Sequence, residues 1–300
     1  GIFFLLNTNS FLSFGEIIWD VYPDEKHLGG APLNFAAHFA KQGGEAYVLS
    51  ALGDDELGNE ALNKLSLWKV NAEYVSVLSG KDTGKCLVTL NECGVPSYNI
   101  VRDSAYDYID CSSVSDGFDA LYFGTLVLRN EYNRRGLAEL IKSHSFKEIF
   151  VDVNLREPFI SRESLMLCME NATVLKISDE ELSAVSKILY NTEYDYKNIV
   201  TEISKTFQNI KFIIITLGEK GSYAYDVFNK ASFSCDAERV TVASTVGAGD
   251  SFSAAFLYKY MSGFDINSCL KTASRISAYV VSKTEAVPEY DQDILLKNTV

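Results

Sequence analysis

Residues 244–252 of this chain, STVGAGDSF, combine residue types that suit phosphoryl transfer. Gly247 and Gly249 can adopt backbone angles closed to other residues, and with the small Ala248 they leave amide N–H groups open to an anion. The apolar residues that follow Asp250 predict a buried helix, whose positive N-terminal end would face the same anion. Asp250 would then take the proton of an attacking hydroxyl. An acid in a first helical turn can equally serve only to compensate the helix dipole.

A second segment, near the N-terminus, belongs with the first. Residues 29–40 read GGAPLNFAAHFA, and the chain continues to LGDD at residues 52–55 and to Gly58. In this order, and about two hundred residues apart, the two segments resemble the two signatures of the PfkB, or ribokinase-like, family of carbohydrate kinases. The similarity covers nearly the whole chain, and its details point to the fructokinase branch.

The resemblance implies a fold and a chemistry. The fold is the α/β ribokinase-like one, in which a central, mostly parallel β-sheet is flanked by helices in three layers and carries a small β-sheet lid. One kinase domain would span residues 1–300. The implied cofactors are ATP and Mg²⁺. Asp250 would be the base of a direct in-line transfer, and the anion hole would consist of Gly247, Ala248 and Gly249.

The sugar site is implied in the N-terminal part of the chain. Residues 14–20 read as a short apolar strand that ends at Asp20, whose carboxylate can accept bonds from paired sugar hydroxyls. Asn34 offers both a donor and an acceptor, which suits a polyol. The resemblance assigns four residues to the sugar: Asp20, Gly29, Gly30 and Asn34. Without the resemblance, Asp20 and the glycine pair would be read as the boundary of a loop.

A further strand supplies an arginine. Residues 150–156, FVDVNLR, run from a buried-strand pattern into polar residues, and open α/β sheets place their ligands at such strand ends. The family has a similar D-x-N-x-R pattern, so Arg156 would lie near the sugar or the transferred phosphate, where a permanently charged planar fork is useful. Another strand, at residues 119–123, ends in the same way, and Arg129 beyond it is predicted at the surface.

The nucleotide site is implied in the C-terminal half. Residues 211–218 form a β-branched run that predicts a buried parallel strand, followed by a tight turn at residues 219–221. By resemblance the nucleotide lies on this turn, and a helix at residues 269–282 walls the adenine. The nucleotide-binding residues would be Thr216, Gly218, Gly221 and Ser274. An ordinary hairpin and ordinary helix packing are the alternatives.

Several positions depart from the family pattern. Ser244 stands where the family commonly has an Asp that is associated with a monovalent cation, so activation by K⁺ is doubtful. Ser178 replaces the Asn of the N-x-x-E region that organises the magnesium, but Glu181 keeps the carboxylate, which suits Mg²⁺ directly or through water. Glu285 replaces a Gly and Ser274 an Asn, and each change could tune nucleotide affinity.

The lid is implied by a break in the strand–helix rhythm. Residues 85–90 and 97–101 alternate around a turn at residues 91–94, which predicts a β-hairpin. By resemblance, the lid consists of two segments, at about residues 18–30 and about residues 82–110. It would close over the sugar and exclude water from the transfer. Family lids often pair two subunits, so a homodimer through the lid is possible.

Composition limits the classes of function. A chain of 300 residues with 47% apolar content can bury one large core. Its net charge of −13, without a cluster of Lys and Arg, argues against nucleic-acid and anionic-membrane partners. Residues 3–6 are apolar but too few for a membrane span and are read as a strand. The six cysteines include no C-x-x-C pair, so they indicate neither a zinc site nor a disulfide scaffold. They suit a cytoplasmic location. His38 lies among apolar helix residues and is predicted in the core.

These inferences predict an ATP-dependent sugar kinase that phosphorylates a terminal hydroxyl, with fructose as the first choice of substrate. One alternative keeps the fold and changes the substrate to ribose, 2-keto-3-deoxygluconate or a riboside. Another is a sensor that binds sugar or nucleotide without turnover, suggested by the serine replacements at residues 178, 244 and 274. A dinucleotide-binding protein is disfavoured, because no G-x-G-x-x-G follows an early strand.

Overall fold

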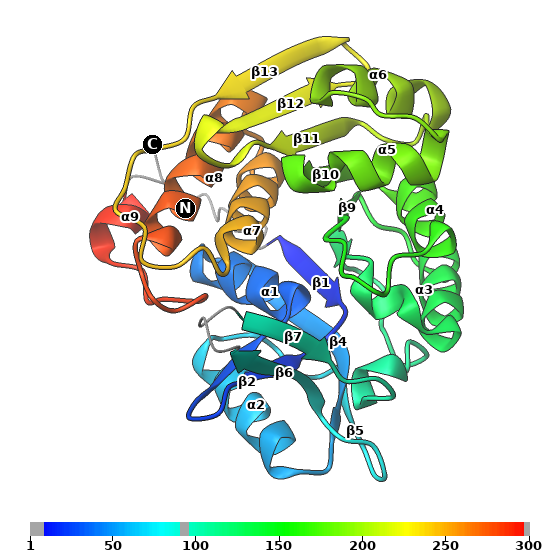
Figure 1. Ribbon diagram of the computed structural model, residues 1–300, viewed down its shortest axis with the longest axis vertical. Coiled ribbons are helices and arrows are strands. Elements are labelled where there is room, and N and C mark those ends of the chain that lie inside the picture. Colours follow the sequence, from blue (N-terminus) through cyan, green and yellow to red (C-terminus); the bar gives the residue numbers. More distant parts are fainter. Residues whose placement is uncertain (1–8, 91–95, 297–300) are drawn as a thin grey trace, which may run out of the picture.

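A nine-stranded sheet forms the middle layer of the computed structural model, which describes residues 9–90 and 96–296 (Figure 1). Its strand order is β13-β12-β11-β10-β9-β8-β1-β4-β5, and all neighbours are parallel except at β11–β12 and β12–β13. The strands are β1 (Ser10–Phe14), β4 (Glu45–Gly53), β5 (Val75–Leu78), β8 (Ala120–Phe123), β9 (Glu148–Asp152), β10 (Val174–Ser178), β11 (Phe212–Thr216), β12 (Ser222–Asp226) and β13 (Ala231–Cys235). The strand predicted at residues 3–6 lies outside the described residues.

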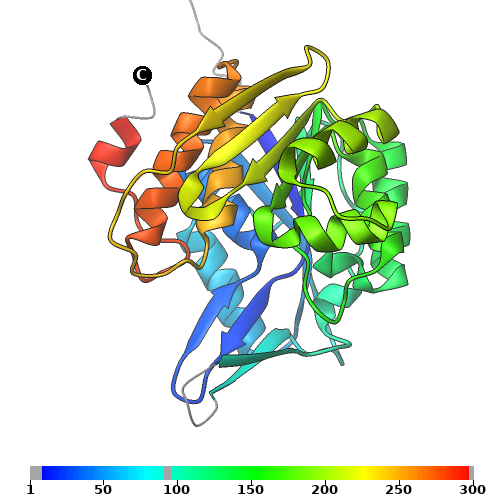
Figure 2. The ribbon, with the colours of Figure 1, turned by 45° about the horizontal axis from the view of Figure 1, so that its top comes forward.

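Helices cover both faces of this sheet (Figure 1, Figure 2). Successive strand residues point to opposite faces, so that Phe11 packs in the core under one helical layer and Leu12 in the core under the other. The first layer contains α1 (Ala31–Lys41), α2 (Glu56–Leu67), α7 (Ala248–Met261) and α8 (Ile266–Val281). The second contains α3 (Glu131–Ser143), α4 (Arg162–Asn171), α5 (Leu182–Tyr190) and α6 (Tyr196–Thr206). The chain continues after α8 to a short α9 (Gln292–Leu296). The predicted three-layer α/β fold is confirmed.

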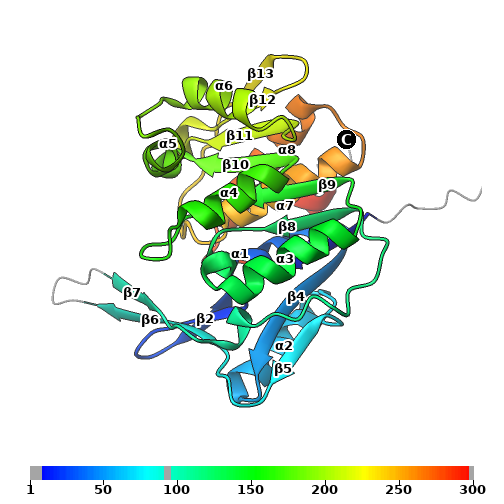
Figure 3. The ribbon, with the colours of Figure 1, turned by 90° about the vertical axis from the view of Figure 1, so that its right-hand side faces the viewer.

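A second, four-stranded sheet projects from the main body (Figure 3). Its order is β3-β2-β6-β7, with strands β2 (Ile18–Val21), β3 (Lys26–Gly29), β6 (Gly84–Leu90) and β7 (Pro96–Ile100). The predicted hairpin is present as the antiparallel pair β6–β7, while its turn at residues 91–94 lies outside the described residues. Beyond Ile100 the chain reaches the 3₁₀ helix η1 (Ala105–Asp107), where Ala105 packs in the core of the main body and the fully buried Tyr106 packs against Ile18 and Cys86 of the small sheet.

The strand predicted at residues 14–20 is divided, which is a correction. β1 ends at Phe14, and β2, which begins at Ile18, belongs to the small sheet. Asp20 therefore lies within a strand of the small sheet. A side chain at Gly15, in the break, would overlap the Pro32 ring in the first turn of α1. The close approach of α1 thus makes the chain leave the main sheet at this point.

One helix boundary differs from the prediction, while the strand predicted in residues 150–156 is present. β9 ends at Asp152, and residues 153–156 form the loop that follows it. α8 begins at Ile266, earlier than predicted, because the Asp265 side chain caps it by accepting from the Ser268 amide.

Arg129 was predicted at the surface, and this prediction is wrong. It ends the 3₁₀ helix η2 (Leu126–Arg129), and its side chain is 6% exposed. Its Nη2 lies 2.8 Å from Oδ2 of Asp107, and its Nε also donates to that carboxylate. A buried guanidinium requires such a partner.

No helix of residues 9–90 and 96–296 has the length and apolar character that a membrane crossing requires.

Candidate active site

A large cleft lies between the small sheet and the carboxyl ends of the main-sheet strands. Its volume is about 2710 Å³, which exceeds the roughly 300–1,000 Å³ of a pocket for one small ligand and leaves room for two. All the predicted site residues line it: Asp20, Gly29, Gly30, Asn34, Arg156, Glu181, Thr216, Gly218, Gly221, Gly247, Ala248, Gly249, Asp250 and Ser274. The fold thus gathers into one cleft residues that lie more than two hundred positions apart in the sequence.

The N-terminus of α7 forms one wall of this cleft. Gly247 is its N-cap and adopts a left-handed backbone with φ 82°, and a Cβ at this position would overlap the carbonyl oxygen of Ala286. Ala248 donates its amide to the Thr245 carbonyl at 3.3 Å. The amides of Gly247 and Gly249 donate to no acceptor within the described part of the chain, so they remain available to an anion at a helix N-terminus.

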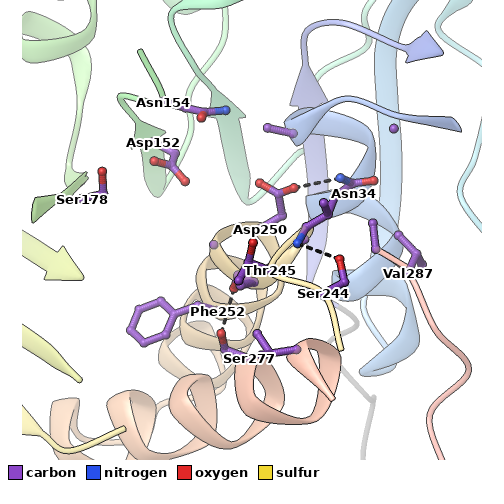
Figure 4. Close-up of a pocket in the computed structure, with 18 of the residues that line it drawn as sticks. Asn34, Asp152, Asn154, Ser178, Ser244, Thr245, Asp250, Phe252, Ser277 and Val287 are labelled. Atoms are coloured by element: carbon purple, nitrogen blue, oxygen red, sulfur yellow. Dashed lines mark hydrogen bonds between the residues drawn. The ribbon is translucent and has the colours of Figure 1, made fainter. Parts of the chain in front are cut away.

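Asp250 lies in the first turn of α7, as predicted. Asn34 of α1 donates from Nδ2 to Oδ2 of Asp250 at 2.8 Å (Figure 4). Burial raises the pKa of Asp250 to about 6, an effect that the Asn34 hydrogen bond opposes and the nearby Asp152 carboxylate reinforces. A carboxylate with this pKa is ionised at neutral pH yet basic enough to accept a proton, as a general base requires.

A buried ion pair lies beside this helix terminus. Lys176 Nζ is 2.7 Å from Oδ2 of Asp152 on the neighbouring strand, and the two side chains are 5% and 4% exposed. A Cβ at Gly249 would lie 3.4 Å from Lys176 Nζ, which places a cation next to the free amides. Lys176 was not predicted as a site residue. Its position inside an apolar strand is nevertheless a signal of a buried ion pair, because lysines are almost never buried without a partner.

The part of the cleft beside the small sheet, where the sugar was predicted to bind, contains several carboxylates around one guanidinium. Asp20 lies in β2, opposite His27 and Cys86, and burial raises its pKa. The Arg156 guanidinium acts in the opposite direction on the pKa of Asp20 and of Asp250. These three predicted residues therefore share one electrostatic environment, which supports their placement in a single site.

Asn34 and the glycine pair adjoin this environment. While Nδ2 of Asn34 is bonded to Asp250, its Oδ1 is buried and has no hydrogen-bond partner among the described residues. That oxygen can accept a bond from a ligand hydroxyl. Gly29 ends β3. Gly30 has φ 107°, and a Cβ at this position would overlap the backbone carbonyl oxygen of Glu16. Glycine is therefore required where β3 turns into α1.

Glu16 is a second residue that the sequence analysis missed. It lines the cleft, is 4% exposed, and its pKa is raised to about 7 by burial, although the Arg156 and Arg129 guanidinium groups lower it. Its carboxylate makes no hydrogen bond to another side chain among the described residues. The signal was again a charged residue inside an apolar run, FGEII.

The part of the cleft that was predicted to bind the nucleotide is built from a turn and a helix. β11 ends at Thr216, and the 3₁₀ helix η4 (Gly218–Lys220) leads to Gly221, whose φ of 93° and contact with the Cys235 carbonyl exclude a side chain. β11 and β12 form an antiparallel hairpin, and both predictions for its turn, nucleotide binding and an ordinary connection, stay predictions. Ser274 of α8 donates to the carbonyl oxygen of Asp236 at 3.2 Å and so ties the helix to the chain beyond β13.

Glu181 has less freedom than the sequence indicated. Its Oε1 accepts the Leu155 amide at 2.6 Å and its Oε2 the Ser178 amide at 2.8 Å, which closes a capping box at the 3₁₀ helix η3 (Asp179–Glu181). Within residues 9–90 and 96–296, no three His, Cys, Asp or Glu side chains gather closely enough to enclose a metal ion. This donor set fits Mg²⁺ held mainly by nucleotide phosphates and water, with a carboxylate as an outer partner.

Ser244 offers no carboxylate at the position where the family commonly has an Asp. Its hydroxyl accepts the amide of Val246 at 3.2 Å and so stabilises the turn that leads into α7 (Figure 4). A hydroxyl engaged in this way replaces neither the charge nor the oxygen count of a carboxylate. The residues present at this position therefore do not fit a dedicated cation site.

Comparison with known proteins identifies the family of this chain. Residues 2–292 match the model described as the pfkB family carbohydrate kinase. The chain belongs to this family. It is therefore an ATP-dependent carbohydrate kinase.

Individual relatives give a closer comparison with this pfkB kinase. The probable fructokinase-4 of Arabidopsis thaliana is 28% identical, over 92% of each chain. The 5-dehydro-2-deoxygluconokinase of Bacillus velezensis is 27% identical, over 88% of this chain and 83% of its own. The crystal structure of Vibrio cholerae fructokinase with fructose, ADP and calcium superposes with a TM-score of 0.83, covering 97% of this chain and 99% of that chain, at 23% identity. The last likeness shows the fold alone.

Proposed function

We propose that this kinase transfers the γ-phosphoryl group of ATP to a terminal hydroxyl of fructose. The observation that carries the proposal is the position of Asp250, a carboxylate with a raised pKa beside the free amides of Gly247 and Gly249. A base and an anion hole at one helix terminus are what transfer to a hydroxyl requires. The fructokinases among the relatives support fructose as the acceptor.

In the proposed reaction, Asp250 accepts the proton of the sugar hydroxyl as the hydroxyl oxygen attacks the γ-phosphorus. The bond from the γ-phosphorus to the bridging oxygen breaks, and ADP leaves with that electron pair. The Gly247 and Gly249 amides, with Ala248 completing the turn, stabilise the charge on the transferred oxygens, and Lys176 adds a cation beside them. No phosphoenzyme forms.

The remaining predicted residues bind and orient the two substrates. Asp20, Gly29, Gly30, Asn34 and Arg156 would hold the sugar, and Thr216, Gly218, Gly221 and Ser274 would hold the nucleotide. Mg²⁺, when bound with ATP, would neutralise the phosphate oxygens, with Glu181 as a partner through water. The small sheet would act as the lid that excludes water, since Asp20 belongs to it.

A homodimer through the small sheet is part of the proposal. Leu87 of β6 is 40% exposed and pairs with Asn99, so it lies on the face of the small sheet opposite to Tyr98, which lines the cleft. An exposed apolar side chain of this kind suits an interface. We also propose a cytoplasmic location, which suits the free thiols of the five described cysteines.

The test is release of ADP from MgATP in the presence of fructose, ribose, 2-keto-3-deoxygluconate or no sugar, with Asp250→Asn as the control. Fructose-dependent release that the variant loses would support the proposal. Preference for 2-keto-3-deoxygluconate would favour a second candidate function, a sugar-acid kinase. The 5-dehydro-2-deoxygluconokinase among the relatives and the Arg156 guanidinium, which can pair with a substrate carboxylate, support this candidate. Binding of sugar and nucleotide without turnover would indicate a sensor and overturn the proposal.

The rate should depend on pH through Asp250. Because the pKa of Asp250 is raised to about 6, its basic form is lost as the pH falls, and we expect kcat/KM to fall about tenfold per unit below about pH 6. Glu16, whose pKa is raised to about 7, could produce a similar decrease at low pH, and the Glu16→Gln variant distinguishes its titration from that of Asp250. The low-pH limb should persist in Glu16→Gln, and its disappearance there would assign the limb to Glu16 instead.

Potassium should not be required for activity. The Ser244 hydroxyl is engaged with the Val246 amide, so this position supplies no carboxylate to a monovalent cation. We expect equal rates in potassium, sodium and lithium chloride at one ionic strength. Ser244→Asp restores the carboxylate and should create a potassium dependence. A strong potassium requirement in the unchanged protein would contradict this expectation.

A further inference from the structure

One face of α1 carries three polar side chains that each reach across to the C-terminal part of the chain. Asn34, His38 and Lys41 are spaced i, i+4 and i+7, which places them on the same side of the helix. Asn34 bonds to Asp250, and Lys41 Nζ lies 3.0 Å from Oε1 of Glu289. His38, between them, is fully buried and is not explained by the proposed reaction.

Both ring nitrogens of His38 are engaged. Nε2 lies 2.9 Å from the carbonyl oxygen of Ala286, and Nδ1 lies 2.7 Å from the hydroxyl of Tyr290. A carbonyl oxygen only accepts, so Nε2 carries the hydrogen, and Nδ1 of the neutral ring accepts from Tyr290. Burial lowers the pKa of His38 to about 4, which keeps the ring neutral at physiological pH. The tautomer and the orientation of the ring are therefore both fixed.

The carbonyl that His38 holds is the one that contacts the proposed anion hole. A Cβ on Gly247 would overlap the Ala286 carbonyl oxygen, and its distance to the Ala286 Cα would be only 3.0 Å. Residues 285–289 also line the cleft. The backbone of Ala286 is thus packed between His38 on one side and Gly247 on the other. A shift of this segment would leave the N-cap of α7 free to change its orientation.

We propose that His38 is a positioning residue that holds the Ala286 segment against Gly247 and thereby keeps the Gly247 amide directed at the transferred phosphoryl group. The inference rests on the proposed role of that amide. The hydrogen bond of an anion hole strengthens as charge develops in the transition state, so its misalignment should lower kcat more than it raises KM. A role in core packing alone would lower stability and leave kcat unchanged.

His144 offers a matched control. Its Nε2 lies 3.0 Å from the Val114 carbonyl oxygen and its Nδ1 2.9 Å from the Ser143 hydroxyl, and its side chain is 14% exposed. It does not line the cleft. His144→Leu therefore removes a similar pair of histidine bonds at a distance from the proposed chemistry, and its effect measures the structural cost alone.

The experiment compares His38→Leu, His38→Gln and His144→Leu, each assayed well below its own Tm for kcat and for both KM values. We expect His38→Leu to lower kcat about tenfold or more, because loss of a whole anion-hole donor costs about 10²–10³. His38→Gln, whose side-chain amide can still donate to Ala286, should recover most of that loss. His144→Leu should lower Tm and leave kcat unchanged. Equal kcat values for His38→Leu and the unchanged protein would overturn the proposal.

A second readout does not depend on turnover. In protein labelled with ¹⁵N-glycine, the Gly247 amide resonance should shift in His38→Leu and stay in place in His144→Leu. If the unchanged protein phosphorylates no sugar, the proposed function fails, yet this resonance still reports whether His38 positions Gly247. An unshifted Gly247 resonance in His38→Leu would overturn the positioning role. Should His38→Leu not fold, Tyr290→Phe removes one of the two His38 hydrogen bonds and should shift the Gly247 resonance from its position in the unchanged protein, and an unshifted resonance there would overturn the positioning role.

Discussion

Replacement of Asp250 by asparagine is expected to lower kcat by about 10²–10⁴, the usual contribution of a positioned general base. The asparagine has the same shape and cannot accept the proton of the sugar hydroxyl. Binding of MgATP and sugar should persist, because the free amides and the sugar-binding side chains are unchanged. Steady-state kinetics and calorimetric titration of each ligand give the two quantities.

The control for this variant is a second carboxylate of the same cleft. Asp179 lines it and is exposed, and within the described residues its side chain hydrogen-bonds only to the adjacent Glu180 amide. Asp179→Asn removes one negative charge from the cleft without touching the proposed base, so kcat should be almost unchanged. A kcat within a few-fold of the unchanged protein for Asp250→Asn would contradict the assignment of the base.

Replacement of Gly247 by alanine is the second large effect, and we expect it to lower kcat by about 10²–10³, as does the loss of an anion-hole donor. The added methyl group would overlap the Ala286 carbonyl oxygen, and the φ of 82° is unfavourable for alanine. The N-cap of α7 must therefore move, and the free amides move with it. Initial rates at saturating ATP and sugar measure the loss.

Gly263, just beyond the other end of α7, distinguishes the effect of the overlap with Ala286 from the effect of the unfavourable φ. It has φ 86°, and no atom lies within 4 Å of a Cβ placed there. Gly263→Ala therefore carries the same backbone penalty without the overlap and far from the cleft. It should lower Tm and leave kcat intact. If Gly247→Ala and Gly263→Ala had equal kcat values, the amides at Gly247 would have no role in the transfer.

The sequence was sufficient for the features that local patterns encode. The apolar strand runs and the residues at their carboxyl ends predicted the parallel sheet and the edge at which Thr216 and Arg156 face the cleft. The glycines at residues 247 and 249 predicted the N-terminus of α7 with Asp250 in its first turn. These features depend on backbone preferences and on the spacing of neighbouring residues, which are visible in a single chain.

Contacts between distant segments could not be predicted in this way. Lys176 and Glu16 interrupt apolar runs, but only the folded chain brings Asp152 to the first and Arg156 near the second. The break between β1 and β2 depends on the approach of Pro32, which no local pattern encodes. Glu181 was recognised as a carboxylate, while the backbone amides that occupy both its oxygens come from other turns.

The most direct test of the central claim is the fate of the γ-phosphoryl group. We would follow MgATP and fructose with the protein by ³¹P NMR in water enriched in ¹⁸O. Direct transfer predicts one fructose phosphate for each ADP, with no ¹⁸O in the phosphoryl group, and a reaction slowed by about 10²–10⁴ with Asp250→Asn. Labelled inorganic phosphate, or no consumption of ATP while both ligands bind, would contradict the account.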